Sequence, residues 1–233
     1  AVFAIGHSAR DTFSMLYQHG LPMQPKAFAV GVRIEHPQEM INQDQYGKNY
    51  PSFLPAAPYK LTANLDNGRG VYTFCMCPGG YVVNASSEEH RLAVNGMSYS
   101  RRDSQNANTA VIVTVSPDDF GSDHPLAGVE FQRKLEEAAY LEGNGKVPVQ
   151  LFGDFEKNIT TTELGEVEPC IKGEYTFANL RNVLPSYVTD SVVEGVHGFS
   201  RFIHDFDRKD AVLSGVESRT SSPVRIIRND ELV

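Results

Sequence analysis

The chain has 233 residues, of which 41% are hydrophobic and 21% charged, and its formal net charge is −8. This composition is typical of a folded globular protein. The acidic balance, without any run of lysine or arginine, argues against a nucleic-acid-binding protein. No segment reaches the roughly 18 apolar residues of a membrane span. The three cysteines, Cys75, Cys77 and Cys170, are an odd number, which argues against a secreted disulfide framework. We therefore expect a cytoplasmic protein with no membrane or nucleic-acid partner.

The chain opens with a pattern of strand, turn and helix. Residues 1–5 are apolar and predict a buried strand, and Gly6 supplies the turn. Ser8, with Asp11 three residues later, is typical of a capped helix N-terminus. Apolar residues then recur at helical spacing as far as Gly20, which predicts a helix that ends there.

The middle of the chain is rich in expected strands, over residues 27–35, 59–65, 70–77, 81–86, 92–99 and 109–115. The turn Pro78-Gly79-Gly80 predicts a hairpin between two of them. Helices are expected over residues 37–46, 125–141 and 187–203. This order favours the α+β class, with a mostly antiparallel or mixed sheet and helices packed on it.

Two more strands are expected near the end, over residues 211–218 and 224–228. We divide the chain into a strand-turn-helix segment over residues 1–25, a middle domain over 26–205 and returning strands over 206–233. The middle domain can bury its own apolar faces, whereas the end strands have only each other as partners. We therefore expect the two ends to lie close together and outside the core. The alternative is a small protein that naturally has strands at both termini.

Several long segments resemble one family of bacterial flavoproteins. The string Ala4-Ile5-Gly6-His7-Ser8-Ala9-Arg10-Asp11 resembles the A-x-GHSARD segment of FAD-dependent dehydrogenases in the glutathione-reductase-like superfamily. Further similar segments follow in order: KAFAVGVRIEHPQ, GVYTFCMCPGGYVV, NGMSYSRRDSQNAN, HPLAGVEFQRKLE and GVESRTSSPVRI. The resemblance implies the internal substrate-side domain of an FAD-dependent oxidoreductase, with remnants of the FAD domain at both ends.

The resemblance also indicates what this stretch of sequence lacks. The G-x-G-x-x-G turn that binds a dinucleotide pyrophosphate does not occur, and the nearest match, Gly68-Arg69-Gly70, precedes a strand. We therefore expect FAD in the parent protein and none bound to this chain alone. Expected partners are the rest of the flavoprotein chain, a small-molecule substrate and NAD(P)H as electron donor. The alternative is a stand-alone, non-enzymatic domain that binds a ligand or another protein.

Candidate cofactor-binding residues follow the first turn, where helix N–H groups could face a flavin or a phosphate: Gly6, His7, Ser8 and Arg10. The alternative is a capped helix without a ligand, and the resemblance favours the cofactor-facing role. Substrate-side candidates are Arg33, Glu35, Cys75, Arg219, Ser221 and Ser222. Arg33 and Glu35 share one face of a strand, which could equally be a solvated sheet face. The serines could be ordinary turn residues.

Cys75 and Cys77 form a C-x-C pair on one face of a predicted strand. Their expected separation of roughly 6.6 Å would strain a disulfide. Zinc usually requires four ligands and no second pair is present, so no metal is expected. Two interpretations stay open: buried small side chains, or one reactive thiol near the turn. No catalytic residue can be named.

Overall fold

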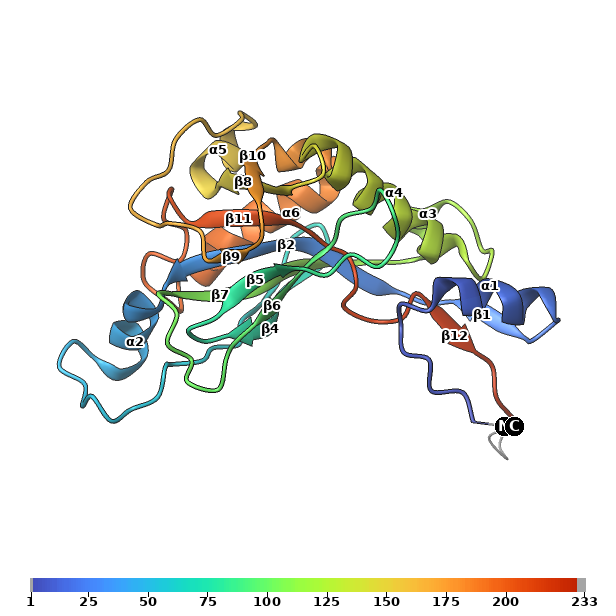
Figure 1. The fold of residues 1–233 in the computed structure, drawn as a ribbon, viewed down its shortest axis with the longest axis horizontal. Coiled ribbons are helices and arrows are strands. Elements are labelled where there is room, and N and C mark those ends of the chain that lie inside the picture. The colour runs from blue at the N-terminus through green and yellow to red at the C-terminus, as the bar shows by residue number, and fades with distance from the viewer. Residues whose placement is uncertain (1, 230–233) are drawn as a thin grey trace.

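A computed structural model describes residues 2–229, in which a seven-stranded sheet is flanked by helices and two smaller sheets (Figure 1). The order in the large sheet is β10-β8-β11-β2-β7-β4-β3, and every pair is antiparallel except β10 with β8. Its strands are β2 Phe28–Pro37, β3 Thr62–Asn64, β4 Gly70–Cys77, β7 Asn106–Val115, β8 Val147–Leu151, β10 Tyr175–Phe177 and β11 Val212–Glu217. The predicted α+β class with a mixed sheet is confirmed.

One face of the large sheet is apolar. In β2 this face carries Val30, Val32 and Ile34, which pair in register with Val113, Val111 and Thr109 of β7. Helix α6, Ser186–Phe199, packs in the same core through its fully buried valine stripe. Gly195 of α6 lies so close to β4 that an added Cβ would be 2.5 Å from Val71. Alternating apolar residues on β2 and a 3.6-residue stripe on α6 thus build one core.

The other face of the same strands is polar but also buried. It carries Arg33 and Glu35 of β2 and Asn108 of β7, all without exposed area. A three-stranded sheet covers it, in the order β6-β5-β9, with β5 Tyr81–Asn84, β6 Val94–Met97 and β9 Ile171–Lys172. The alternative that Arg33 and Glu35 form a solvated face is wrong, because this second sheet excludes water from them.

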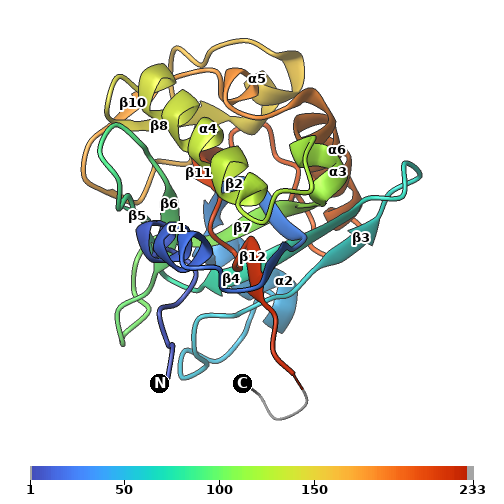
Figure 2. The same cartoon turned by 90° about the vertical axis from the view of Figure 1, so that its right-hand side faces the viewer.

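The helices lie close to their predicted positions. Helix α2 is Gln38–Tyr46 and α4 is Ala127–Glu142, each near the expected range. The remaining helical elements are short: α3 Pro117–Phe120, α5 Phe152–Lys157 and the 3-10 turn Leu180–Asn182. Figure 2 shows α4 crossing in front of the large sheet. Among the helices of residues 2–229, none is both long and apolar enough to cross a bilayer.

A small lobe gathers the two ends of the described chain (Figure 1). It contains α1 Arg10–Gln18 and an antiparallel pair, β1 Met23–Pro25 with β12 Val224–Ile226. Phe13, Leu16, Met23, Val129 and Val224 form its own hydrophobic cluster. The expectation that the two ends lie close together is confirmed by this strand pair.

The first predicted strand is wrong within the described residues. Residues 2–5 form no strand, and Val2 and Phe3 are exposed, because no sheet edge lies beside them. Residue 1 lies outside the described range. The helix begins only at Arg10, and its N-cap Ala9 has no side-chain cap. Ser8 therefore does not cap α1. Its Oγ lies 3.0 Å from His7 Nδ1 instead.

The predicted hairpin at Pro78-Gly79-Gly80 is also wrong. β4 belongs to the large sheet and β5 to the three-stranded sheet, so this turn passes the chain between layers. An added Cβ at Gly79 would lie 1.9 Å from the Arg102 carbonyl oxygen, and the Gly80 N–H donates to the Asn106 carbonyl at 2.8 Å. The turn is packed against residues 98–106, which prevents β4 and β5 from pairing.

Strand β11 lies inside the core sheet, contrary to the expectation that both end strands lie outside it. It pairs with β8 on one side and β2 on the other, and all six of its residues are buried. Residues 212–217 therefore share the sheet of the middle domain, whereas β12 pairs outside it. The assignment of residues 206–233 to the flavin domain of a longer protein stays a prediction.

Candidate functional site

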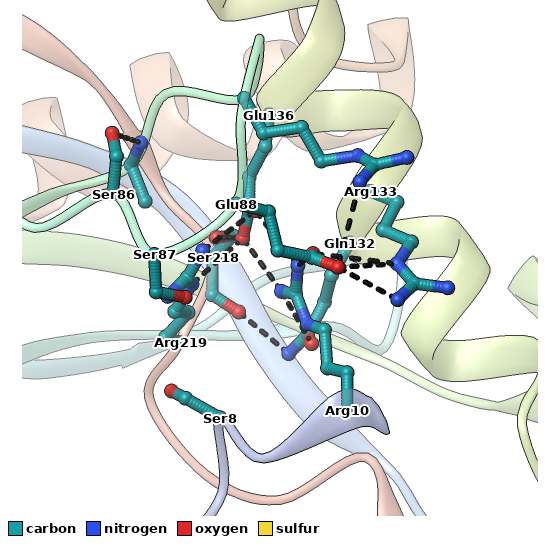
Figure 3. Close-up of polar contacts among 12 residues, drawn as sticks. Ser8, Arg10, Ser86, Ser87, Glu88, Gln132, Arg133, Glu136, Ser218 and Arg219 are labelled. Carbon is teal, nitrogen blue, oxygen red and sulfur yellow. Dashed lines mark hydrogen bonds and ion pairs between the residues drawn. The ribbon is translucent and has the colours of Figure 1, made fainter. Parts of the chain in front are cut away.

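A buried carboxylate on α4, Glu136, receives two arginines from distant parts of the chain (Figure 3). Arg10 donates to its two oxygens at 2.7 and 2.8 Å, and Arg219 does so at 2.9 and 2.8 Å. Ser218 Oγ donates a further hydrogen bond at 2.6 Å. With their neighbours these residues form the Glu136 cluster: Arg10, Glu88, Gln132, Arg133, Glu136, Ser218 and Arg219.

The electrostatics of the cluster favour the ionised carboxylate. Burial opposes ionisation of Glu136, but the hydrogen bonds and charges of Arg219 and Arg10 outweigh it and lower its pKa to about 2. Glu88, from the loop between β5 and β6, pairs with both Arg10 and Arg133. The pKa of Glu88 is lowered as well, because these two arginines overcome its partial burial. The cluster is therefore a set of ion pairs whose charges compensate one another, while Arg10 Nε has no hydrogen-bond partner among the described residues.

The cluster positions the segment before α1. Arg10 is 2% exposed and is committed to Glu136 and Glu88, so it does not face a ligand. Gly6 and His7 are exposed and Ser8 is half-buried. Burial and the nearby charges of Arg219 and Arg10 lower the pKa of His7. The ion pairs thus hold a short accessible loop beside Arg219.

A second region is a pocket of ≈ 650 Å³ between β4 and β6. This β4–β6 pocket is lined by residues 75–78, residues 95–100 and Arg102. The guanidinium of Arg33 lies behind it and donates to the Cys75 carbonyl at 2.6 Å and to Asn95 Oδ1 at 2.9 Å. Because Cys75 and Asn95 come from different sheets, one buried cation ties both walls of the pocket together.

Two buried carboxyls flank Arg33. Glu217 Oε2 lies 3.4 Å from Arg33 Nη1, and burial raises the pKa of Glu217 to about 7 against the attraction of Arg33. Glu35 accepts hydrogen bonds from Asn106 and from the Cys170 N–H on one oxygen. Burial raises its pKa to about 7 as well, despite these bonds. These carboxyls can therefore exchange protons near neutral pH.

The polar layer around Arg33 is incompletely satisfied. Within residues 2–229, no partner is found for Arg33 Nε, Glu35 Oε1, Ser214 Oγ or either side-chain atom of Asn108. Buried polar atoms are normally paired with protein, ordered water or a ligand. An added Cβ at Gly96 would lie 2.6 Å from Arg33 Cζ and 2.4 Å from Asn108 Oδ1, so glycine lets the pocket wall approach this layer closely.

All three cysteines are free. Cys75 is exposed and Cys77 half-buried, and burial raises the pKa of both thiols. Neither is therefore activated as a thiolate at neutral pH. No three His, Cys, Asp or Glu side chains in the described part of the chain are grouped to hold a metal ion.

Residues 27–220 match the family model described as FAD-dependent protein, C-terminal domain-like. The chain belongs to this family. A protein of Clostridium beijerinckii (strain ATCC 51743 / NCIMB 8052), itself described as uncharacterized, is 54% identical over 236 residues and covers 99% of the chain. The alignment covers 44% of that relative, so the chain spans less than half of its length.

Membership of this FAD-dependent C-terminal domain-like family supports the predicted relation to flavoproteins, while the glutathione-reductase-like superfamily stays a prediction. The matched range contains the whole β4–β6 pocket and Glu136, but it begins after Arg10. The Glu136 cluster therefore joins the family domain to the segment that precedes it.

The structure separates the predicted site residues into two places. Gly6, His7, Ser8 and Arg10 lie with Arg219 at the Glu136 cluster. Arg33, Glu35 and Cys75 lie at or behind the β4–β6 pocket. Ser222 Oγ donates to the Val224 carbonyl at 2.8 Å, which accounts for it as a turn residue, and Ser221 lies next to it. The roles of these residues in binding stay predictions.

Sequence reasoning missed Glu136 and Glu217. A glutamate in an amphipathic helix normally faces solvent, and only its place on one stripe with the buried Gly128 and Gln132 distinguishes Glu136. Glu217 is the last residue of a fully buried strand and follows Val216, and an acidic residue is unusual at such a position. The positions of these two glutamates in otherwise apolar or small-residue patterns were the sequence signals for a buried carboxylate.

Proposed function

We propose that this chain is the substrate-side domain of an FAD-dependent oxidoreductase, and that the β4–β6 pocket receives the substrate. The observation that carries the proposal lies inside the matched family range. A fully buried arginine, Arg33, lies behind the pocket and is bonded to the lining residues Cys75 and Asn95. It is flanked by two carboxyls with pKa values near 7. Oxidation or reduction of an organic substrate usually requires proton transfer, for which groups that titrate near neutral pH are suited.

The residues of this chain do not form an FAD site on their own. Arg10 forms ion pairs with Glu136 and Glu88, and the sequence has no glycine-rich turn for a pyrophosphate. In the proposed enzyme FAD supplies the redox chemistry and is held mainly by other parts of a longer protein. The exposed Gly6 and His7 would contribute to that binding only as an edge of the site.

The small end lobe is the proposed contact with the rest of the flavoprotein chain. Several exposed apolar side chains belong to its segments: Val2 at 94% and Phe3 at 55% exposure, Met15 of α1 and Ile227 after β12. We take these exposed apolar residues as support for a surface that packs against protein. NAD(P)H as the electron donor and a cytoplasmic location are further parts of the proposal.

The longer Clostridium beijerinckii relative allows a direct test. We would purify it, and a chimera in which residues 1–233 replace its matching segment, and record flavin absorbance. Both are expected to contain FAD, and NADH or NADPH should bleach the flavin absorbance in the absence of oxygen. Candidate oxidants can then be screened for reoxidation of the reduced flavin. Absence of flavin from both proteins would favour the non-enzymatic binding domain instead.

The chain alone provides the control. It is expected to show no saturable FAD binding up to about 100 μM. Any binding would then be weaker than the roughly −5.5 kcal/mol that corresponds to a Kd of this size. Tight binding by this chain would contradict the claim that other segments hold the cofactor. In the chimera, Asn95→Ala should raise the KM for the oxidant found in the screen and leave the flavin content unchanged. The reason is that Asn95 lines the pocket and contacts Arg33.

A further inference from the structure

Cys75 and Cys77 are two free thiols that line one wall of the β4–β6 pocket. They lie on an irregular part of β4. Phe74 pairs with Ala110 and Cys77 pairs with Asn108, so three steps along β4 cover the same length as two steps along β7. Cys75 itself has φ of +46°, in the left-handed region.

This bulge matters for the distance between the thiols. In a flat strand, residues two apart are separated by about 6.6 Å, at the long limit of disulfide geometry. An inserted residue shortens the path from Phe74 to Cys77, and Cys75 lies within this shortened stretch. The Cys77 Sγ also lies beside the Cys75 backbone, since it donates to the Cys75 carbonyl oxygen at 3.3 Å.

We propose that Cys75 and Cys77 form a dithiol site that reacts with a low-molecular-weight organic disulfide entering the pocket and closes into an intrachain disulfide. Cys75 is the attacking thiol, because it is the exposed member of the pair. Cys77 is the resolving thiol. This site is separate from the proposed flavin chemistry and requires no cofactor.

The reaction is a thiol–disulfide exchange that balances without another reagent. The Cys75 thiolate attacks one sulfur of the organic disulfide, its S–S bond breaks, and the first thiol leaves with the proton that Cys75 gave up. The Cys77 thiolate then attacks Cys75 Sγ, and the second thiol leaves with the proton of Cys77. The two protein thiols are oxidised to one disulfide, and the organic disulfide is reduced to two thiols.

The charges around the pair set its pH dependence. Burial raises the pKa of both thiols, the Arg33 guanidinium lowers it, and ionised Glu217 raises it again. For Cys77, Cys75 adds to the rise and a hydrogen bond with Ser98 lowers it. Since the thiolate is the nucleophile, exchange is expected to accelerate as the pH rises from 7 to 9. Glu217→Gln removes the negative charge and should accelerate exchange at pH 8.

The test uses the chain with excess bis(2-hydroxyethyl) disulfide at pH 8, followed by an acid quench, intact mass measurement and peptide mapping. The chain is expected to lose the mass of two hydrogen atoms, with Cys75 and Cys77 joined. Cys77→Ser should accumulate a hydroxyethylthio adduct on Cys75. Cys170→Ser is the matched control and should behave like the unsubstituted chain.

Stable adducts on both cysteines without ring closure would overturn the proposal, and so would an unreactive pair while Cys170 reacts. A thermal melt of each variant shows that it is folded. Phenylarsine oxide gives a second measurement, because a trivalent arsenical binds two nearby thiols. One equivalent should protect Cys75 and Cys77 from alkylation together, and either serine variant should lose this protection.

Discussion

Arg219 and Glu136 meet through two hydrogen bonds of 2.9 and 2.8 Å, although they lie 83 residues apart in the chain. The Glu136 side chain is fully buried and Arg219 is 9% exposed. Arg10 shares the same carboxylate from the other side. One acidic residue of α4 therefore holds together the first residue of α1 and the segment after β11.

We expect Glu136→Gln to lower the free energy of unfolding by about 3 to 5 kcal/mol, because Arg219 loses its carboxylate and Arg10 loses one of its two. Urea unfolding followed by circular dichroism measures the change. Glu130→Gln is the matched control on the same helix, since Glu130 is 60% exposed and forms a surface ion pair with Arg133. It should change stability by less than about 1 kcal/mol. Equal losses in both variants would show that the cluster is not a stabilising contact.

Acid should weaken the same contact. The pKa of Glu136 is lowered to about 2 by Arg219 and Arg10 against the effect of burial. Its ionisation therefore stabilises the fold above the ordinary glutamate pKa of about 4.3, and this contribution is lost as pH falls from there toward 2. Unfolding free energies measured between pH 5 and 2.5 should fall more steeply in the unsubstituted chain than in Glu136→Gln. Parallel curves would contradict this assignment.

Glu217 should have the opposite pH dependence. Burial raises its pKa to about 7, so its contribution is complete below the ordinary glutamate pKa and is lost as pH rises through 7. Buried His36, with its pKa lowered to about 4 by burial, changes stability in the other direction over part of this range. The difference between the unsubstituted chain and Glu217→Gln isolates the glutamate. That difference should favour the variant progressively from pH 5 to 8, and the exposed-site control Glu174→Gln should show no such trend.

Alanine at position 96 is expected to destabilise the fold. A Cβ there would meet Arg33 Cζ and Asn108 Oδ1 at 2.6 and 2.4 Å, and both partners are fixed in a buried layer. We expect Gly96→Ala to lower the melting temperature, with a loss of about 1 to 3 kcal/mol. Gly198→Ala in α6 is the control, because its Cβ would have an ordinary 3.8 Å contact with Ala63 and alanine favours a helix. A destabilised control with an unaffected Gly96 variant would contradict the packing described here.

Hydrogen exchange should distinguish the two end strands. Amides of β11 are expected to exchange as slowly as those of β2, since both are central strands of the large sheet. Amides of β1 and β12 should exchange faster, because that pair has only three residues in each strand. Native-state exchange with mass spectrometry measures both in one experiment. Fast exchange in β11 would place it outside the cooperative core.

Local periodicity explains what the sequence could predict. β4 has the expected bounds Gly70–Cys77, and α4 begins and ends near its predicted limits. Such patterns report which face of an element is apolar. They do not report which strand is the neighbour, so the turn at Pro78-Gly79-Gly80 was assigned to a hairpin although it connects two sheets.

The candidate site shows the same limit. Arg10 and Arg219 could be selected from polar segments, but their common partner lies 126 and 83 residues away, where no short-range pattern reaches. Arg33 could be placed on one strand face, whereas its burial depends on β6, which packs over it. Residue chemistry was therefore predictable in part, and the pairing that gives each group its pKa was not.

The pairing of β1 with β12 has a mechanical consequence. Pro25 and Val224 lie opposite each other, so the chain between them leaves and returns at points about 5 Å apart. This narrow two-strand connection is supplemented by contacts between α1 and α4. Rotation of α1 about the connection requires Arg10 to separate from α4, because Arg10 belongs to α1 and Glu136 to α4. Reorientation of α1 would therefore have to break the ion pairs of Glu136 and the apolar cluster that Val129 of α4 shares with Phe13 and Leu16.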